Sequence, residues 1–523
     1  MTFRRIPLSV WVLVLGSSQA MGAGLELNQH GVKETSHAFA GSAALLEDAS
    51  AIAHNPAGLT RLDSSQFSGG LTALYADIDY SAEFQREKIE NRKGVAPRPI
   101  EGSGQASSKA ITPLPHLYYS HAVNDHTALG IGIYAPFGSG SDYEAGWQGR
   151  YHAEETEQSA VNINPTMATE LSDELSVGLG VVIQAYEATL TNQIDVAYLV
   201  AESFLDQAGI EDEGNVDEVL DRADEARNQA GDVINEVEID SIGYGFSFGV
   251  LWEPREDTRI GLNYRSRVEH LAEGEAERPN LEDVGEAVES TLEDYGAGDD
   301  LARDARDQAT GKLGAAGGDL SSSITFPEMA ELSVHHELTD RIALMGSIAY
   351  TNWSVFDEIR LEYDIDPAGE TADAGDTDAP TRGGEELAGE DLKRRDLVQP
   401  LNFEDSWRFG VGASYEWNEQ LALRTGLSFD QSPLKDPQNR TPRGPDSDRF
   451  IIGLGASYQV DEHLAVDLGY AYTRIGMEWR DGLPRSTRAD VAPRENPAGT
   501  LHRGEGSTRT NLHSLGVQAM YEF

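Results

Sequence analysis

The chain has 523 residues, no cysteine and a formal net charge of −49 at pH 7, from 89 acidic and 40 basic side chains. So large a negative charge excludes nucleic-acid binding, because the phosphates would be repelled. More than half of this charge falls in the blocks 201–240, 271–320 and 363–400, which are predicted to be solvated loops between apolar, glycine-rich segments.

The first predicted element is a secretory signal peptide over residues 1–22. Arg4 and Arg5 precede an apolar run from Ile6 to Leu15, and small residues follow it, which is the usual layout of such a signal. The run is too short to cross a bilayer as a helix, and no later stretch has about 18 consecutive apolar residues. The mature chain is therefore expected to be soluble and exported, or to cross a membrane as strands.

The next segment, residues 23–65, has an unusual composition. Its part Glu47 to Leu62, EDASAIAHNPAGLTRL, has no strand or helix period and too little apolar bulk for a core of its own. Asn55-Pro56 favours an extended or turned backbone that cannot continue a helix. The dipeptide is either ordinary loop punctuation or part of a segment that packs against the rest of the protein.

Residues 66–523 carry repeated two-residue alternation, in which one face of each strand is apolar and the other is polar or glycine-rich. The clearest examples are Ile242 to Trp252, Trp407 to Trp417, Phe450 to Tyr458, Leu464 to Tyr472 and Leu515 to Phe523. One such strand fits a sandwich or a barrel equally well. Tyrosine and tryptophan at the strand ends suit the two interfaces of a membrane.

The connections between these strands favour the barrel. Short turns alternate strictly with long loops, as in an up-and-down meander with one rim in the periplasm and the other outside the cell. About 14 strands result. The predicted fold is therefore all-β, a transmembrane antiparallel up-and-down β-barrel. The short turns are Asn124 to His126, Ser172 to Glu174, Pro254 to Asp257, Thr339 to Arg341, Asn418 to Gln420 and Asp461 to His463, and the long loops are 85–113, 137–158, 192–237, 274–323, 364–402, 431–447 and 480–510.

Two of the long extracellular loops are predicted to contain helices. Apolar residues recur at helical spacing from Val216 to Val237 and from Leu281 to Tyr295, with acidic residues opposite them in the first segment. Such a stripe has to be covered, either by the other helix or by a hydrophobic ligand. Packing of the two helices against each other is the expected arrangement.

Several motifs, in this order along the chain, resemble the FadL-type outer-membrane transporters of long-chain fatty acids and other hydrophobic compounds. They are GLELNQHGVKETSHAFAGSAALLEDASAIAHNPAGLTRL at Gly24 to Leu62, GWQGRYHA at Gly146 to Ala153, VNINPTMA at Val161 to Ala168, YGFSFGVLWEP at Tyr244 to Pro254, RIGLNYRSRVEH at Arg259 to His270, TNWS at Thr351 to Ser354, LALRTGLSFDQSP at Leu421 to Pro433 and PDSDR at Pro445 to Arg449. The resemblance implies a monomeric barrel whose lumen is closed by an N-terminal hatch, or plug, at residues 23–65. Asn55, Pro56 and Ala57 are similar to the family's hatch and gating motif.

The resemblance also implies a route for the ligand, from extracellular loops to the lumen and then sideways through a gap at a kinked third strand. The matching segment is ALGIGIYAPFGSG, Ala128 to Gly140, and the candidates for the kink are Tyr134, Pro136, Phe137 and Gly138. Pro136 cannot donate a ladder hydrogen bond, so it either creates a defect in the wall or ends the strand at the rim.

Three inward-facing arginines, Arg265, Arg408 and Arg424, are candidates for binding a fatty-acid carboxylate. The competing interpretation pairs them with inward acids such as Glu416, Asp430 and Asp467, because unpaired buried charge is costly.

The function that the resemblance implies is energy-independent uptake of long-chain fatty acids across the bacterial outer membrane, and the alternative is uptake of alkanes or aromatic hydrocarbons. Expected partners are the hydrophobic ligand, outer-membrane lipid and lipopolysaccharide, and the outer-membrane assembly machinery, which would bind the C-terminal Phe523. No cofactor, metal ion or enzymatic activity is expected, since the sequence has no phosphate-binding or H-E-x-x-H motif. Its G-x-S-x-G match at Gly245 to Gly249 lies within an alternating strand and not at the strand-to-helix turn of a nucleophile elbow. An adhesin or phage receptor without a luminal pocket is a further alternative.

Overall fold

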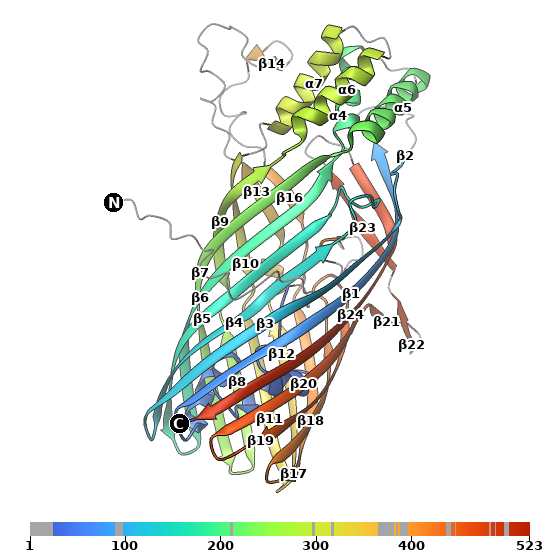
Figure 1. Cartoon of the computed structure of the whole chain (residues 1–523). Coiled ribbons are helices and arrows are strands. Elements are labelled where there is room, and N and C mark those ends of the chain that lie inside the picture. The colour runs from blue at the N-terminus through green and yellow to red at the C-terminus, as the bar shows by residue number, and fades with distance from the viewer. Residues whose placement is uncertain are drawn as a thin grey trace, which may run out of the picture.

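The protein is a tall closed barrel with a group of helices on one rim (Figure 1). The computed structural model describes residues 25–88, 98–209, 213–294, 299–314, 318–363, 381–382, 385–386, 396–435, 441–444, 446–480, 483–486, 488–495 and 501–523. The predicted signal peptide, 1–22, lies outside these residues. Strand β1 (Gln66–Lys88) pairs with β24 (Leu501–Glu522) from Gln66 opposite Glu522 upward, and this antiparallel pairing closes the ring.

The wall has fourteen strands, four of them interrupted, and this confirms the predicted barrel. In chain order they are β1, β3 (Gln105–Asn124), β4 (Thr127–Asp142), β5 (Glu155–Ser172), β6 (Leu175–Ile194), β7 (Val233–Arg255), β8 (Thr258–Arg265) with β9 (Val268–Glu277), β10 (Gly318–Phe326) with β11 (Met329–Thr339), β12 (Ile342–Thr351) with β13 (Glu358–Tyr363), β16 (Asp396–Pro400) with β17 (Ser406–Asn418), β18 (Leu421–Asp430), β19 (Arg449–Gln459), β20 (Leu464–Ile475) and β24. Shorter strands in the loops are β2 (Arg98–Pro99), β14 (Thr381–Arg382), β15 (Glu385–Glu386), β21 (Met477–Arg480), β22 (Leu483–Ser486) and β23 (Arg488–Glu495).

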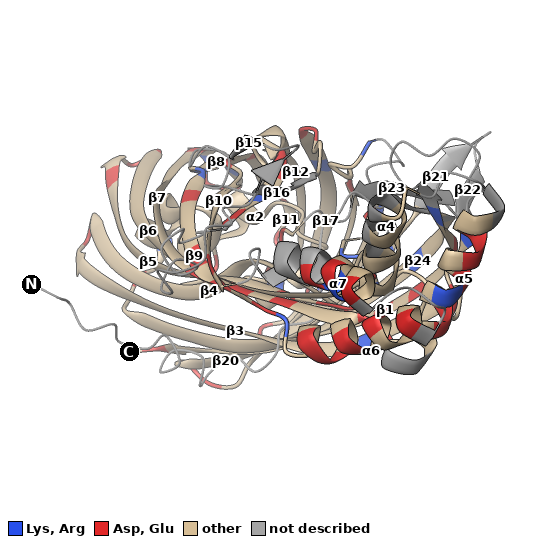
Figure 2. Ribbon diagram, turned by 90° about the horizontal axis from the view of Figure 1, so that it is seen from above, with Lys and Arg blue, Asp and Glu red and all other residues tan. Residues whose placement is uncertain are grey.

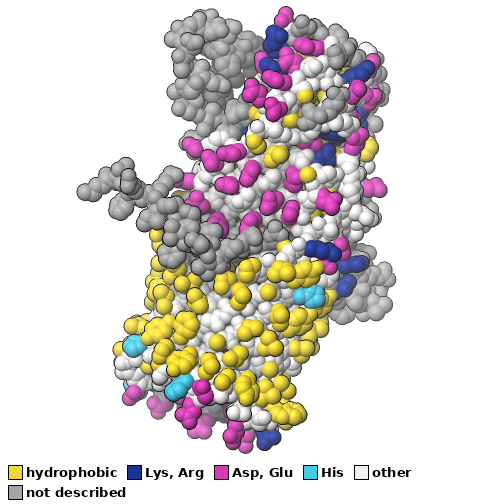
Figure 3. Space-filling view, in the orientation of Figure 1, with side chains coloured by type: hydrophobic (Ala, Val, Ile, Leu, Met, Phe, Trp, Pro, Cys, Tyr) yellow, Lys and Arg dark blue, Asp and Glu magenta, His cyan; other side chains and the backbone are white. Residues whose placement is uncertain are grey.

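The longest strands change the character of both faces about half way along. On β7, the outward residues from Ile242 to Trp252 are apolar or aromatic, whereas the outward residues above them include Asp240 and Glu238. The inward residues change in the opposite sense, from glycine and serine to Ile239 and Val237. A transmembrane strand needs only about 9–11 residues. The lower half of the wall therefore crosses the membrane, and the upper half stands above it, as the hydrophobic band below an acidic surface in Figure 3 shows.

All six predicted short turns are confirmed, but the strands extend further into the long loops than the sequence predicts. The loop expected over 192–237 is shorter because β6 runs to Ile194 and β7 begins at Val233. Likewise β1 continues to Lys88 and β3 begins at Gln105, inside the loop expected over 85–113. The reason is that outward acidic residues of the upper wall have the composition of a solvated loop.

Residues Leu25–Ser65, here called the hatch, lie inside the lower half of the barrel (Figure 1). The sequence shows no helix or strand period in this segment, but the backbone is not irregular throughout. It forms several very short helices joined by turns. Each is too short to be stable alone, so the hatch depends on the barrel wall for its structure. The helices are α1 (Val32–Ser36), α2 (Ser42–Leu45), α3 (Ala51–His54) and the 3₁₀ helix η3 (Pro56–Arg61).

Four helices cover one side of the extracellular mouth (Figure 2), and many of their exposed residues are acidic. They are α4 (Val196–Gln207), α5 (Glu213–Ala230), α6 (Leu281–Asp294) and α7 (Asp299–Gly314), here called the cap. The predicted helices correspond to α5 and α6; α5 ends at Ala230, so Val233 and Val237 belong to β7, and α4 and α7 were not predicted. The apolar stripes pack in one shared core, as expected. Among the described residues, no helix has the length and apolar character needed to cross a bilayer.

Candidate functional site

Asn55 fixes the path of the hatch at its only Asn-Pro step. It ends α3 with an extended backbone, φ −166° and ψ 105°, and Pro56 is the first residue of η3. The Asn55 side-chain amide donates hydrogen bonds to the carbonyl oxygens of Ala43, at 2.8 Å, and Val250, at 3.0 Å. Its oxygen accepts a hydrogen bond from the Ala57 N–H at 3.1 Å. One buried side chain therefore joins two parts of the hatch to strand β7.

Glycines in the wall allow this close contact. A Cβ atom at Gly249 of β7 would overlap the Asn55 side chain, and a Cβ at Gly178 of β6 would overlap the Pro56–Ala57 peptide. The hatch backbone thus lies directly on the backbone of the wall, which only glycine permits at this distance. The small side chains of the hatch segment serve the same close packing.

The three predicted arginines are buried and paired, and most of their partners belong to the hatch. The arginines are paired with carboxylates, as the competing interpretation predicts, but the carboxylates are different ones. Glu416, Asp430 and Asp467 form no ion pair with these arginines. Strand alternation shows that a side chain faces inward but not which hatch residue meets it there. The ion pairs are Arg265 Nη2 to Glu26 Oε1 at 3.5 Å, Arg408 Nη2 to Glu331 Oε2 at 3.0 Å and Arg424 Nη2 to Glu47 Oε2 at 2.8 Å, and Arg408 also donates to Asn28.

The wall has a break between β3 and β4. Pairing of these strands ends at Leu117 opposite Ile133, although β3 continues upward beside β1 and β4 continues beside β5 to Asp142. On the β5 side, the register shifts between Tyr134 and Phe137, so that β4 has a bulge at this point. Pro136 lies in the bulge and does not end the strand.

The first described residues of the hatch occupy the edge of β4 at this bulge. The Leu27 N–H donates to the Pro136 carbonyl at 2.9 Å, and the Gly138 N–H donates to the Leu25 carbonyl at 2.8 Å. Glu26 lies directly opposite Phe137 in this antiparallel bridge. The beginning of the hatch thus supplies two of the backbone hydrogen bonds that β3 does not make to the upper part of β4.

An aromatic cluster lies inside the barrel beside this bridge, and the sequence patterns do not predict it. Phe137 stacks on Phe326 with ring centroids 4.5 Å apart, and Tyr186 and Trp353 contact the same pair. The Arg265 guanidinium lies 5.2 Å from the centre of the Phe137 ring. The sequence feature that could have predicted this cluster is the set of inward-facing positions on the upper strands. Apolar residues occupy these positions there, whereas polar residues and glycine occupy them in the lower half. Other members of this cluster, here called the luminal cluster, are Leu25, Ile239, Ile324, Phe356, Leu361, Leu401 and Phe403.

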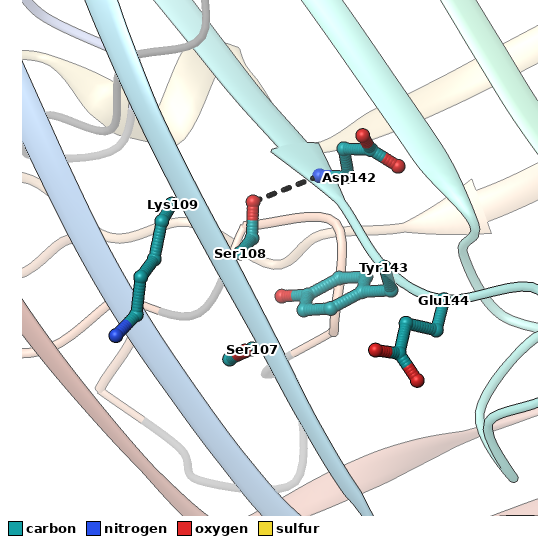
Figure 4. Close-up of a pocket in the computed structure, with 6 residues that line it drawn as sticks. All are labelled: Ser107, Ser108, Lys109, Asp142, Tyr143 and Glu144. Atoms are coloured by element: carbon teal, nitrogen blue, oxygen red, sulfur yellow. Dashed lines mark hydrogen bonds between the residues drawn. The ribbon is translucent and has the colours of Figure 1, made fainter.

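A polar cavity of about 270 Å³ lies at the upper end of the break, between Ser107–Lys109 of β3 and Asp142–Glu144 (Figure 4). One hydrogen bond crosses here, from the Asp142 N–H to the Ser108 hydroxyl at 2.9 Å. Tyr143 points across from the end of β4 toward β3. At this height the separated strands are therefore joined by the Ser108 side chain and not by a backbone ladder.

Further aromatic residues lie above the break, in and around the GWQGRYHA motif. The centroid of the Trp147 ring lies 4.7 Å from that of Tyr143, 5.6 Å from that of Tyr80 and 5.5 Å from that of Phe84. The Trp147 indole N–H donates to the Ala153 carbonyl at 2.9 Å. These rings form a second buried apolar cluster, above the break.

Buried ion pairs lie at the base of the cap, one to strand β1 of the wall and one between the β4–β5 loop and the link from α5 to β7. Arg150 Nε lies 2.8 Å from Asp232 Oδ2, and Arg86 of β1 pairs with Asp195 at the start of α4 at 2.5 Å. Burial and the neighbouring charge of Asp195 raise the pKa of Asp232 to about 6, although Arg150 opposes the shift. Within the described part of the chain, no group of three or more His, Asp or Glu side chains is placed to hold a metal ion.

The outward apolar band, the closed antiparallel wall and the hatch inside it define a bacterial outer-membrane channel. A family model described as outer membrane protein transport protein (OMPP1/FadL/TodX) matches residues 13–523, and the chain belongs to this family. It is thus an outer-membrane transporter of hydrophobic compounds.

Individual relatives show two kinds of ligand. The chain is 26% identical over 452 residues to the long-chain fatty acid transport protein of Escherichia coli (strain K12), covering 86% of this chain and 87% of that one. The crystal structure of a Pseudomonas aeruginosa FadL homologue superposes with a TM-score of 0.70 at 20% identity, covering 96% of this chain and all of the other. The crystal structure of the Ralstonia pickettii toluene transporter TbuX superposes with a TM-score of 0.54 at 14% identity, covering 94% of this chain and 98% of that one.

Proposed function

We propose that the protein takes up long-chain fatty acids by facilitated diffusion, with no energy source. The ligand is captured by the aromatic residues around Trp147, binds at the luminal cluster and leaves sideways through the break between β3 and β4. Release into the bilayer is favourable because each buried methylene contributes about 0.8 kcal/mol. The hatch, with Asn55, Pro56 and Ala57 at its contact with the wall, keeps the lumen closed to the periplasm.

The observation that carries this proposal is the position of Arg265 against the luminal cluster. A guanidinium beside stacked aromatic rings matches an amphiphile with one anionic end. Arg408 and Arg424 match it less well, since their partners Glu331 and Glu47 hold them at 3.0 and 2.8 Å. The pair between Arg265 and Glu26 is longer, at 3.5 Å. Arg265 is therefore the best of the three carboxylate-binding candidates.

The same pair gives a mechanism for opening. Glu26 presents a carboxylate to Arg265, and a fatty-acid carboxylate that binds there competes with it. Displacing Glu26 pulls on Leu25 and Leu27, whose backbone holds the edge of β4 at the bulge. Binding of the ligand is in this way coupled to loss of the bridge and to opening of the wall around Tyr134, Pro136, Phe137 and Gly138.

The test measures binding of radiolabelled oleate and of toluene to the purified full chain and to Arg265→Met. We expect Arg265→Met to weaken oleate binding by about 10- to 100-fold, which corresponds to one lost charged hydrogen bond, and to leave toluene binding unchanged. Arg267→Met is the matched control, because Arg267 is an exposed arginine two residues away.

Tighter binding of toluene than of oleate, with no effect of Arg265→Met on either, would support the alternative function, uptake of alkanes or aromatic hydrocarbons. Failure of both ligands to bind would favour an adhesin or receptor role. The proposal further includes a monomeric barrel without catalytic activity. It also includes recognition of Phe523, whose side chain is exposed, by the outer-membrane assembly machinery.

A further inference from the structure

A group of basic residues interrupts the acidic surface above the hydrophobic band. Lys109 of β3, Arg474 of β20 and Arg509 of β24, here called the basic patch, face outward. Strand β20 pairs with β24, and β1, which carries Asp77 and Asp79, lies between β24 and β3. Arg474 and Lys109 belong to one row across the sheet, through Asn511 and Asp77. Figure 3 shows basic side chains gathered at the upper edge of the band, beside a histidine.

The two arginines of the patch are less constrained than Lys109, although Asp79 of β1 stands directly opposite Arg509 in the sheet. Within the part of the chain that the structure describes, neither Arg474 nor Arg509 forms an ion pair, whereas Lys109 lies 3.3 Å from Asp77. This is unexpected in a chain with 89 acidic and 40 basic side chains. On the other side of the upper wall the outward positions are acidic, as where Glu187 of β6 stands directly opposite Asp240 of β7. Three cations thus stand among the two carboxylates Asp77 and Asp79, and the one surplus positive charge is available to an external anion.

Directly below the patch lies a row of aromatic residues with polar groups. Tyr472, His513 and Tyr75 are cross-strand neighbours on β20, β24 and β1, and all three are half-buried on the outer face. The Tyr470 hydroxyl lies 2.8 Å from His513 Nδ1, and the Tyr472 hydroxyl donates to Asn511 Oδ1 at 2.9 Å. Tyrosines of this kind mark the depth of lipid headgroups. The basic patch thus stands at the level where headgroup phosphates lie.

The rim beside the patch identifies the leaflet. The patch is on the side of the band that carries the long loops and the cap, which in outer-membrane barrels is the extracellular side. The outer leaflet there consists of lipopolysaccharide, whose lipid A part carries phosphates over several acyl chains. We infer that the basic patch, with Tyr75, Tyr472 and His513 beneath it, is a binding site for the phosphates of lipid A. This inference depends on the outer-membrane location and not on the transported compound.

The experiment titrates bisphosphorylated lipid A against the full chain in detergent micelles and counts bound lipid by native mass spectrometry. Dephosphorylated lipid A and phosphatidylglycerol are titrated in parallel. We expect wild type to bind bisphosphorylated lipid A at least tenfold more tightly than either. The triple variant Lys109→Gln, Arg474→Gln, Arg509→Gln is expected to lose about 100-fold, since each cation near the headgroups contributes about a factor of five to ten.

Two further variants separate the patch from general charge and from folding. Arg255→Gln, Arg267→Gln, Arg341→Gln removes three exposed arginines elsewhere on the outer surface and is expected to bind like wild type. Lys109→Arg, Arg474→Lys, Arg509→Lys keeps the charges and is expected to retain binding, which excludes misfolding as the cause of a loss. Unchanged binding by the first triple variant, an equal loss in the arginine control, or equal affinity for phosphatidylglycerol would overturn the inference.

Discussion

Arg265 contacts a carboxylate of the hatch on one side and the aromatic ring of Phe137 on the other. In the proposed mechanism Glu26 holds the place that the ligand carboxylate takes. The two side chains should then affect oleate binding in opposite directions, because one attracts the ligand and the other competes with it.

We predict that Glu26→Gln binds oleate more tightly than wild type, by about three- to tenfold, since the neutral amide competes less well for Arg265. Equilibrium binding of radiolabelled oleate to the purified chain measures this. Glu47→Gln is the control, because Glu47 is also a hatch carboxylate paired with an arginine but lies on Arg424. Weaker binding in Glu26→Gln would show that Glu26 positions Arg265 and does not compete with the ligand.

At the scale of elements, the bridge between the hatch and β4 can be locked without interference from native cysteines, since the chain has none. Glu26 and Phe137 face each other at a bridge flanked by the hydrogen bonds of Leu27 and Gly138. In such a pair the Cα atoms lie about 4.5 Å apart, which suits a disulfide.

We predict that Glu26→Cys, Phe137→Cys forms a disulfide and that the oxidised protein takes up oleate at least tenfold more slowly than the same protein after reduction. Uptake into cells or proteoliposomes, with and without a reducing agent, measures the difference. The comparison of two redox states of one variant removes the effect of the substitutions themselves. Equal uptake in both states would mean that the wall opens without loss of this bridge.

The stability of the cap is expected to depend on pH through Asp232, which lies between α5 and β7. The pKa of Asp232 is raised by burial from 3.8 to about 6. Between these pH values the closed cap binds one proton more than the open form, so its stability falls as pH rises from about 4 to 6, by up to about 1.4 kcal/mol per pH unit. Hydrogen exchange of the α4 and α5 amides, corrected for intrinsic rates, should show this slope.

Asp232→Asn should reduce the slope, because the amide does not titrate. The remainder comes from Asp224 of α5, whose pKa is also raised by burial. Glu218→Gln, which neutralises an exposed carboxylate of α5, should retain it. A slope of the same size in both variants would mean that the other carboxylates of the cap, and not Asp232, cause the pH dependence.

The elements also show how far the sequence predicts this structure. Alternation from Ile242 to Trp252 and the short turns such as Asn124 to His126 were sufficient to predict strand number, closure and turn positions, since lipid outside and water inside impose a strict period of two. The same rule failed above the membrane. There Glu238 faces water and Ile239 faces the lumen, so the upper wall was interpreted as loop and the luminal cluster was missed.

The site shows a related limit. Arg265, Arg408 and Arg424 were identified because they are inward-facing cations on strands, but their partners Glu26 and Glu47 come from the hatch. No periodicity connects a strand residue with a segment several hundred residues away. For Pro136 the sequence left two alternatives, a local defect in the wall or the end of the strand, whereas the occupation of this site by the hatch backbone is a long-range contact that only the folded structure contains.

At the scale of the whole molecule, the acidic side chains of the described residues gather on the upper wall and the cap, in a chain whose net charge is −49. Like charges stand directly opposite each other there, as with Glu187 and Asp240, and such pairs are destabilising. The Debye length, beyond which exposed charges are largely screened from each other, is about 10 Å at 0.1 M salt and about 3 Å at 1 M. The part of the protein above the membrane should therefore need salt, whereas the transmembrane band should not.

We predict that the upper wall and cap become more resistant to proteolysis as NaCl rises from about 0.01 to 1 M, while the heat-resistant barrel band on gels stays unchanged. The double variant Glu187→Gln, Asp240→Asn should need less salt for the same protection, since it removes one repulsive pair from the wall. Glu253→Gln is a suitable control, because Glu253 pairs with Arg61 near the short turns and neutralising it relieves no such repulsion. Indifference of proteolysis to salt would mean that the ion pairs of Arg86 and Arg150 outweigh the repulsion between the acidic side chains.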